Sequence, residues 1–260
     1  MKICRFTTTE KNSPQFGILT DEWIVPVGFE DLLESAESAF TSSATGEKIS
    51  LPQARLLPPS NPSKIVCIGR NYAEHAKELG NEVPADPLLF LKAPTALITE
   101  GETILIPPQS ARVEHEGELA LIIKRTAKNI AAEENPLDYV LGYACLNDVT
   151  ARDLQRKDVQ FTRAKSFDTF CPISNFIETE LDPAALAVTV RVNGQVKQAG
   201  NTRDMVFSVA DLIRYISAQM TLLPGDLIAT GTPSGVAQLN KGDVCTVEIE
   251  RLGTLTNPVA

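Results

Sequence analysis

Short apolar runs rich in β-branched residues dominate the chain from residue 64 onward. Glycines, prolines and an Asn-Gly pair separate these runs, which lie at 65–68, 96–99, 103–106, 119–123, 187–192 and 244–250. Apolar runs bounded by turn residues are typical of β-strands. The Asn193-Gly194 pair between two runs favours a tight hairpin turn. The pattern therefore predicts a domain made mostly of strands.

Helical spacing is less frequent, and the amino-terminal part has a pattern of its own. Helices are predicted at 71–79, 151–157 and 209–219. Near the amino terminus, strand-like runs at 16–19 and 23–27 precede a helical stretch at 29–36, and prolines with small polar residues at 57–63 mark a linker. We therefore expect an α+β protein with a small N-terminal α/β unit, residues 1–60, and a mostly β main domain, residues 61–260.

Three acidic residues accompany the apolar runs near the middle of the chain. Glu116 and Glu118 come directly before the run 119–123, and Asp148 follows another apolar stretch. On a strand, residues two apart point to the same face, so the two glutamates are expected side by side. Carboxylates that close repel each other unless a cation lies between them. An oxygen-only ligand set suits Mg²⁺, Mn²⁺ or Ca²⁺ and leaves open positions for water and substrate.

The same glutamates could instead form a solvated strand edge. The abrupt change from charged residues to the apolar run 119–123 favours the metal site, because it places Glu116 and Glu118 where the strand enters a core. Spacing alone does not exclude the simpler interpretation.

The segment 71–79 predicts a short helix that carries a second chemical group. Asn71 is a suitable N-cap and Gly80 a natural stop. His75 and Glu78 are three residues apart and share one face, and a carboxylate beside an imidazole makes a general base. Both side chains could also simply face solvent. The only other histidine, His115, alternates with the glutamates and is expected on the opposite face of the sheet.

Three further polar residues are suitable donors to an anionic substrate. Arg152 and Gln155 lie three apart on the predicted helix that follows Asp148, and Lys165 comes shortly after it. The loop 230–235, with Thr232 at its centre, has glycines that let a backbone approach a ligand, although a simple turn is the default interpretation of this motif.

Composition excludes several classes of protein. A net charge of −9 in a chain of 260 residues argues against a nucleic-acid-binding face. No apolar run approaches the roughly 20 residues that cross a bilayer, and no signal peptide is evident, so we expect a soluble cytoplasmic protein with no membrane partner. The five cysteines are far apart and predicted to be reduced. Motifs of serine hydrolases, dinucleotide-binding domains and zincins are missing.

Taken together and in order, these segments resemble the fumarylacetoacetate hydrolase family. The resemblance runs from residue 64 to the C-terminus, and it is closest to bacterial single-domain members. The segments that carry it are Ile68-Gly-Arg-Asn-Tyr-Ala-Glu-His-Ala-Lys-Glu78, Glu116-Gly-Glu118, Asn147-Asp-Val-Thr-Ala-Arg-Asp-Leu-Gln155, Lys165-Ser-Phe-Asp168, Asn201-Thr-Arg-Asp-Met-Val-Phe207 and Thr230-Gly-Thr-Pro-Ser-Gly-Val236.

The resemblance implies a mixed β-sandwich roll that forms a homodimer and holds Mg²⁺ or Mn²⁺. The positions implied as metal ligands are Glu116, Glu118 and Asp148; those implied as catalytic are His75, Glu78 and Lys165; those implied to bind substrate are Arg152, Gln155 and Thr232. Gly117 departs from the apolar residue that many relatives carry there. Substrate specificity is expected from residues 82–91 and from the loop around Thr232.

The implied reaction is hydrolysis of the C3–C4 bond of an acylpyruvate, a small 2-oxo acid. His75, oriented by Glu78, would activate water, Lys165 would stabilise the oxyanion, and the departing enolate would stay on the metal. The alternatives are decarboxylation or tautomerisation of oxaloacetate and isomerisation of an unsaturated 2-oxo dioate such as 2-hydroxyhepta-2,4-diene-1,7-dioate. A non-catalytic binding protein stays open, although the complete set of implied site residues argues against it.

Overall fold

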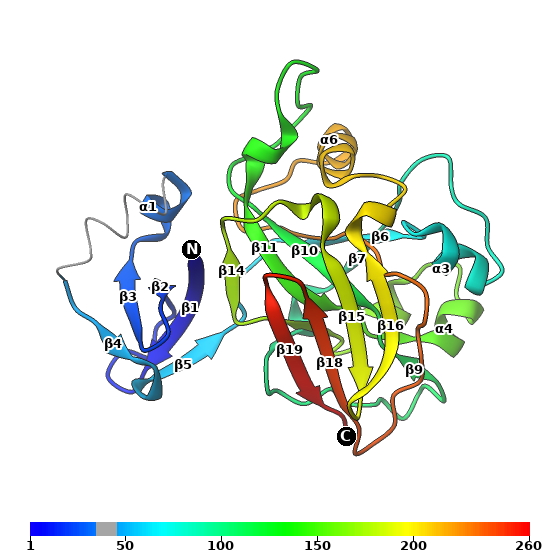
Figure 1. The fold of residues 1–260 in the computed structure, drawn as a ribbon, viewed down its shortest axis with the longest axis horizontal. Coiled ribbons are helices and arrows are strands. Elements are labelled where there is room, and N and C mark those ends of the chain that lie inside the picture. Colours follow the sequence, from blue (N-terminus) through cyan, green and yellow to red (C-terminus); the bar gives the residue numbers. More distant parts are fainter. Residues whose placement is uncertain (35–45) are drawn as a thin grey trace.

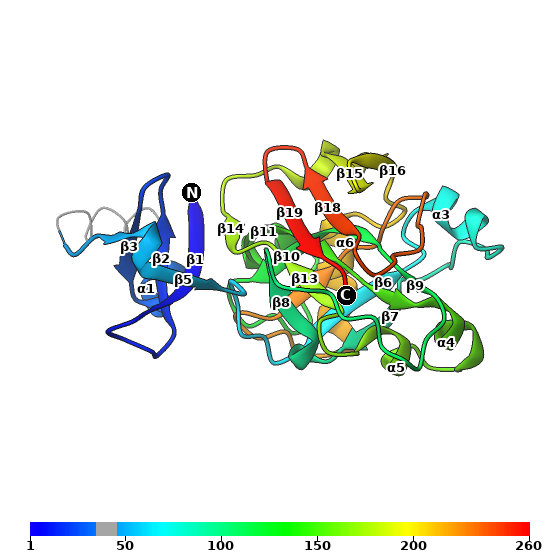
Figure 2. The ribbon, with the colours of Figure 1, turned by 90° about the horizontal axis from the view of Figure 1, so that it is seen from below.

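The computed structural model describes residues 1–34 and 46–260, and its mixed, mostly β fold confirms the predicted class (Figure 1). The N-terminal elements are β1 (Lys2–Thr8), β2 (Gln15–Leu19), β3 (Trp23–Val27), α1 (Phe29–Glu34), β4 (Ile49–Ser50) and β5 (Ala54–Leu57). Helix α1 confirms most of the predicted helix 29–36, whose last two residues lie outside the described residues. Helices α3 and α4, defined below, lie at the opposite end of the molecule from the N-terminal strands in both ribbon views (Figures 1 and 2).

A large sheet forms the centre of the molecule. Its other strands are β6 (Ile65–Gly69), β7 (Leu88–Lys92), β8 (Leu97–Thr99), β10 (Gly117–Ile123), β11 (Val140–Asn147), β13 (Cys171–Ile173), β14 (Phe176–Glu178) and β17 (Leu227–Ala229). The strand order is β4-β3-β2-β1-β14-β11-β10-β17-β6-β7, with parallel pairing of β6 to β17 and of β8 to β13. Strand β1 pairs with β14 and so joins the N-terminal strands to this sheet. The domain boundary at residue 60 stays a prediction.

A second sheet packs over the central strands β10 and β11. Its strands are β15 (Ala187–Val192), β16 (Gln195–Asn201), β18 (Val244–Ile249) and β19 (Gly253–Pro258), in the order β16-β15-β18-β19. Leu119 and Leu121 of the large sheet share one buried cluster with Val190 and Val247 of the smaller one. The predicted hairpin is confirmed, since Asn193 and Gly194 between β15 and β16 both have positive φ. The two apolar faces therefore enclose the main core.

Close approach of the two sheets accounts for the glycine between the two glutamates. A Cβ atom at Gly117 would lie 2.3 Å from Cγ2 of Val190. Any larger residue there would force the sheets apart locally. The departure from the family pattern therefore matches tight packing of β10 beneath β15.

The remaining elements are helices and one small ladder. The helices are α3 (Ala73–Glu78), α4 (Arg152–Lys157), α5 (Thr162–Lys165) and α6 (Val209–Gln219), and the ladder joins β9 (Val113–Glu114) to β12 (Thr150–Ala151). The predicted helices are confirmed, whereas α5 was not predicted. The predicted strand 103–106 is wrong: only Ile104 forms a bridge, with Val259. Within the described residues, no helix has the length and apolarity to cross a membrane.

Candidate active site

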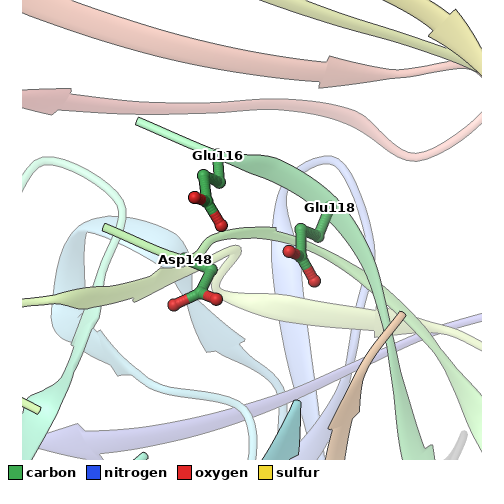
Figure 3. A group of neighbouring side chains, drawn as sticks. All are labelled: Glu116, Glu118 and Asp148. Atoms are coloured by element: carbon green, nitrogen blue, oxygen red, sulfur yellow. The ribbon is translucent and has the colours of Figure 1, made fainter. Parts of the chain in front are cut away.

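Glu116, Glu118 and Asp148 come together at one end of β10 and β11 (Figure 3). One carboxylate oxygen from each residue lies within 4.8 Å of the others, and all three residues are buried. Antiparallel pairing of Gly117 with Asn147 brings the segments together, and the backbone N–H of Asp148 donates to the carbonyl of Glu116 at 2.8 Å. Glu116 lies just before β10 rather than within it. The solvated-edge interpretation of these glutamates is therefore wrong.

Two of these carboxylates have buried cationic partners. Lys165 Nζ donates to Glu116 Oε2 at 2.7 Å and to Asp148 Oδ2 at 2.6 Å. Lys92 Nζ donates to Asp148 Oδ1 at 2.6 Å, and the Arg152 guanidinium pairs with Glu116. The only donor to Glu118 among the described residues is the backbone N–H of Gly231, at 2.8 Å.

This unequal pairing shifts the pKa values of Glu116 and Glu118 in opposite directions. Burial tends to raise the pKa of Glu116, but the charges of Lys165 and Arg152 outweigh burial and hold that pKa below its ordinary value. Burial raises the pKa of Glu118 well above its ordinary value, and the charges of Asp148 and Glu116 raise it further. Among the described residues, Glu118 therefore lacks the cationic partner that Glu116 and Asp148 have. A compact set of carboxylate oxygens fits a hard divalent cation such as Mg²⁺ or Mn²⁺, which would supply that missing charge.

His75 and Glu78 form a pair on α3, as their spacing predicts. The distance between His75 Nδ1 and Glu78 Oε2 is 3.3 Å, and His75 is buried, so it does not simply face solvent. Both Glu78 carboxylate oxygens also accept from the backbone N–H of Gly235 at 3.1 Å. The pair is thus fixed to the loop 230–235 as well as to its own helix.

The predicted N-cap role of Asn71 is wrong. Residue Tyr72 occupies the cap position, without a side-chain cap bond. The Asn71 side chain instead donates to the Thr230 carbonyl at 2.8 Å and accepts from the Phe207 backbone N–H at 2.8 Å. Asn71 therefore anchors the turn before α3 to two distant segments, which no local sequence pattern reveals.

A cavity of about 280 Å³ connects these groups. Most of the predicted site residues line it, namely His75, Glu116, Glu118, Arg152, Gln155, Lys165 and Thr232. Asp148 and Glu78 do not line it and contact it only through the neighbours that they bind.

The residues predicted to bind substrate are themselves strongly held. The Arg152 guanidinium bonds to Glu114, Glu116 and Gln155. The Thr232 hydroxyl donates to the Gly117 carbonyl at 2.8 Å and accepts from the side-chain amide of Gln198 at 2.8 Å. These contacts fix the shape of the cavity wall before any ligand binds.

His115 lies away from the cavity, as its alternation with the glutamates predicts. Its Nδ1 lies 3.1 Å from Gln198 Oε1 on β16, and the residue is fully buried. The imidazole that lines the cavity is therefore that of His75.

Lys92 and Glu114 bind other charged residues of the site, and sequence reasoning missed both of them. Lys92 ends the apolar strand β7, where a single charge after an apolar run was the available signal. Glu114 shares the alternation of Glu116 and Glu118, yet its carboxylate binds Arg152 and Arg112 outside the cluster of three. The Lys92–Asp148 and Glu114–Arg152 contacts join distant segments, so spacing along the chain does not identify them.

Comparison with known proteins gives consistent results. The family model described as "Fumarylacetoacetate (FAA) hydrolase C-terminal" matches residues 64–260, and the one described as "Rv2993c-like, N-terminal" matches residues 1–59. Protein Rv2993c of Mycobacterium tuberculosis is 48% identical over 230 residues, covering 87% of this chain and 86% of that protein.

Two further relatives cover the whole chain. A protein of Xenopus laevis named oxaloacetate tautomerase fahd2, mitochondrial, is 36% identical over 288 residues, covering 100% of this chain and 90% of that protein. The crystal structure of a protein from Mycobacterium smegmatis named 5-carboxymethyl-2-hydroxymuconate delta-isomerase has a TM-score of 0.86 and 39% identity, covering 100% of this chain and 98% of that one. These matches establish that the chain belongs to the fumarylacetoacetate hydrolase family.

Proposed function

We propose that this enzyme moves a proton at the carbon next to the carbonyl group of a small 2-oxo acid, as a tautomerase or isomerase. The observation that carries the proposal is that His75 lines the same cavity as Glu116 and Glu118. An imidazole paired with a carboxylate is suited to take up and return a proton near neutral pH.

The carboxylates of Glu116, Glu118 and Asp148 would hold Mg²⁺ or Mn²⁺. A bound divalent cation polarises a carbonyl oxygen and makes the hydrogens on the adjacent carbon more acidic. Lys165 and Lys92 hold the carboxylates of Glu116 and Asp148 in place, so that these two ligands are positioned to bind. Glu118 would gain its missing positive partner.

Glu78 fixes the orientation of the base. When its carboxylate accepts from the protonated Nδ1 of His75, Nε2 of the imidazole carries the free electron pair. Nε2 can then take a proton from carbon and return it to oxygen or to another carbon of the same molecule. No atom is gained or lost, which defines a tautomerisation or isomerisation.

The comparisons support this reaction over the hydrolysis expected from the sequence. One relative that covers the whole chain is named an oxaloacetate tautomerase. Two similar solved structures are named 5-carboxymethyl-2-hydroxymuconate delta-isomerase and 2-hydroxyhepta-2,4-diene-1,7-dioate isomerase. Hydrolysis of an acylpyruvate is the second candidate, because the same His75–Glu78 pair could take a proton from water, and a similar structure is titled fumarylacetoacetate hydrolase.

Spectroscopy with two substrates tests the proposal. We expect purified protein with Mg²⁺ to speed the enol–keto conversion of oxaloacetate strongly and a chelator to abolish the effect. Glu78→Gln should slow the reaction at least tenfold, whereas Glu74→Gln, on the same short helix but without a hydrogen bond to His75, should not.

Other outcomes would redirect the assignment. Faster loss of acetylpyruvate than of enol-oxaloacetate would make hydrolysis the leading function. Release of CO₂ from oxaloacetate at the same rate as enol conversion would favour decarboxylation. Inactivity towards every 2-oxo acid, with tight binding retained, would point to a binding protein. The homodimer and the cytoplasmic location stay predictions, which sedimentation and fractionation can check.

A further inference from the structure

Two arginines of the cavity differ from the other cations around it. Lys165 and Arg152 each bind buried carboxylates. Arg70 and Arg156 also line the cavity, yet neither makes a side-chain hydrogen bond or ion pair with any residue that the structure describes. Because a guanidinium has five N–H donors, these two side chains offer unused donors to whatever enters the cavity.

The backbone at Arg70 is held in an unfavourable conformation. Its φ is 60°, in the left-handed region that side chains other than Gly, Asn and Asp rarely adopt. Asn71 keeps the turn in place through its bonds to Thr230 and Phe207. Strained backbone kept in place by its surroundings is concentrated at ligand-binding sites. The anchored turn places a charged side chain at the wall of the cavity.

Arg156 lines the same cavity from helix α4. It lies on α4 four residues after Arg152 and one after Gln155, so the three share one helix face. Arg152 bonds to Gln155 and to two buried glutamates, whereas Arg156 is exposed at the cavity. The helix thus presents one paired arginine and one that has no partner among the described residues.

We propose that Arg70 and Arg156 bind the second carboxylate of a 2-oxo dioate. This inference rests on the proposed function, in which the carboxylate and carbonyl at one end of the substrate meet the acidic cluster and its cation. The other end of the substrate would then face donors that no carboxylate of the described residues neutralises. A methyl group there would leave both guanidinium groups without partners, so the pair selects dioates over 2-oxo monoacids.

This assignment places specificity outside the segments expected to provide it. The sequence suggested residues 82–91 and the loop around Thr232 as sources of specificity. The Thr232 hydroxyl already bonds to Gly117 and Gln198, whereas no described residue accepts from the guanidinium groups of the two arginines. Charge recognition by Arg70 and Arg156 is therefore better placed to separate one substrate class from another.

Calorimetry with paired ligands tests the proposal directly. In Mg²⁺, binding of 2-oxoglutarate is compared with that of 2-oxopentanoate, which differs only in having a methyl group at the far end. The same comparison with 2-oxoheptanedioate and 2-oxoheptanoate covers a longer reach. We expect the dioate to bind at least tenfold more tightly in one pair or both. The advantage should fall to less than threefold in the double variant Arg70→Asn and Arg156→Gln.

Matched variants separate recognition from folding and from general charge. Asn accepts the left-handed backbone, so Arg70→Asn should unfold at the same temperature as the parent or higher. Arg70→Lys should retain part of the advantage. Lys157→Gln removes a charge from the residue next to Arg156 that does not line the cavity, and it should retain the whole advantage.

Each alternative outcome has a distinct meaning. Equal binding of dioate and monoacid by the parent protein would overturn the proposal and leave the proposed function intact. A dioate advantage that persists in the double variant would overturn the assignment to these arginines. Failure of all four ligands to bind in Mg²⁺ would overturn the proposed function as well.

Discussion

Glu116 and Glu118 are two residues apart, and both are buried, yet they lie in opposite electrostatic environments. On the paired side of the cluster, Lys165, Lys92 and Arg152 surround the carboxylates of Glu116 and Asp148. On the unpaired side, Glu118 accepts only one backbone N–H from the described residues. The pKa of Glu116 is lowered and that of Glu118 is raised.

The difference shows how a fold can prepare a cation site without a cation. Three negative charges this close would oppose folding if none were compensated. The paired side holds two ligands in place, and the unpaired side keeps a carboxyl group whose proton an incoming ion can displace. Each prediction below changes one side of the cluster and leaves the other intact.

The largest effect is expected when the paired side loses its shared cation. Lys165→Met removes the ammonium that bridges Glu116 and Asp148 and leaves two buried carboxylates with one partner fewer. Breaking a buried ion pair from one side typically costs about 3–5 kcal/mol. Urea unfolding without metal should show a loss of this size, and added Mg²⁺ should recover part of it.

Lys157→Met provides the control for the Lys165 variant. Lys157 is exposed at the end of α4, so its replacement should change the free energy of unfolding by less than about 0.5 kcal/mol. Equal stability of Lys165→Met and the parent in metal-free buffer would mean that Lys165 does not hold the paired side together.

A smaller effect of opposite sign should distinguish the two glutamates. Glu116→Gln takes a charged partner from Lys165 and Arg152 and should destabilise the metal-free protein by about 1–3 kcal/mol. Glu118→Gln removes repulsion and can still accept from Gly231, so its stability should equal or exceed that of the parent. Thermal unfolding in chelator measures both.

Metal affinity should not follow this difference in stability. Each substitution removes a carboxylate ligand, so both should weaken Mg²⁺ binding at least tenfold. Loss of stability in Glu118→Gln as large as that in Glu116→Gln would show that the two sides of the cluster are electrostatically alike.

Much of the candidate site could be predicted from the sequence because its signals are local. The alternation of Glu116 and Glu118, the spacing of His75 and Glu78 and the Asn193-Gly194 turn depend on residues close in the chain. The motif order then indicated the family, and with it the mixed, mostly β fold.

The paired side of the cluster could not be predicted, because its contacts join distant segments. Lys92 reaches Asp148 across 56 residues, and Arg152 reaches Glu114 across 38. Asn71 has the sequence context of a helix cap, but its hydrogen bonds with residues more than a hundred positions away determine its role instead. The prediction of a strand at 103–106 failed for a related reason, since an apolar run forms a strand only where a partner strand lies beside it.

The smallest predicted effect concerns the pH dependence of the unpaired side. Burial and the neighbouring carboxylates raise the pKa of Glu118 well above its ordinary value of 4.5, so the folded, metal-free protein holds a proton that the unfolded chain has released. Stability contributed by this group is therefore present below about pH 4.5 and is lost as pH rises towards the folded pKa. Through this one group, the free energy of unfolding can change by at most about 1.4 kcal/mol per pH unit.

A cation that binds at Glu118 must displace that proton, so metal binding favours the ionised carboxylate. Affinity for Mg²⁺ should therefore rise with pH, by at most about tenfold per unit, until the folded pKa of Glu118 is passed. Calorimetry in two buffers of different ionisation enthalpy counts the protons released. The parent protein should release more protons than Glu118→Gln at the same pH, and the affinity of that variant should depend less on pH. An identical proton count in both would show that Glu118 is already ionised in the metal-free protein and that its side of the cluster has a positive partner after all.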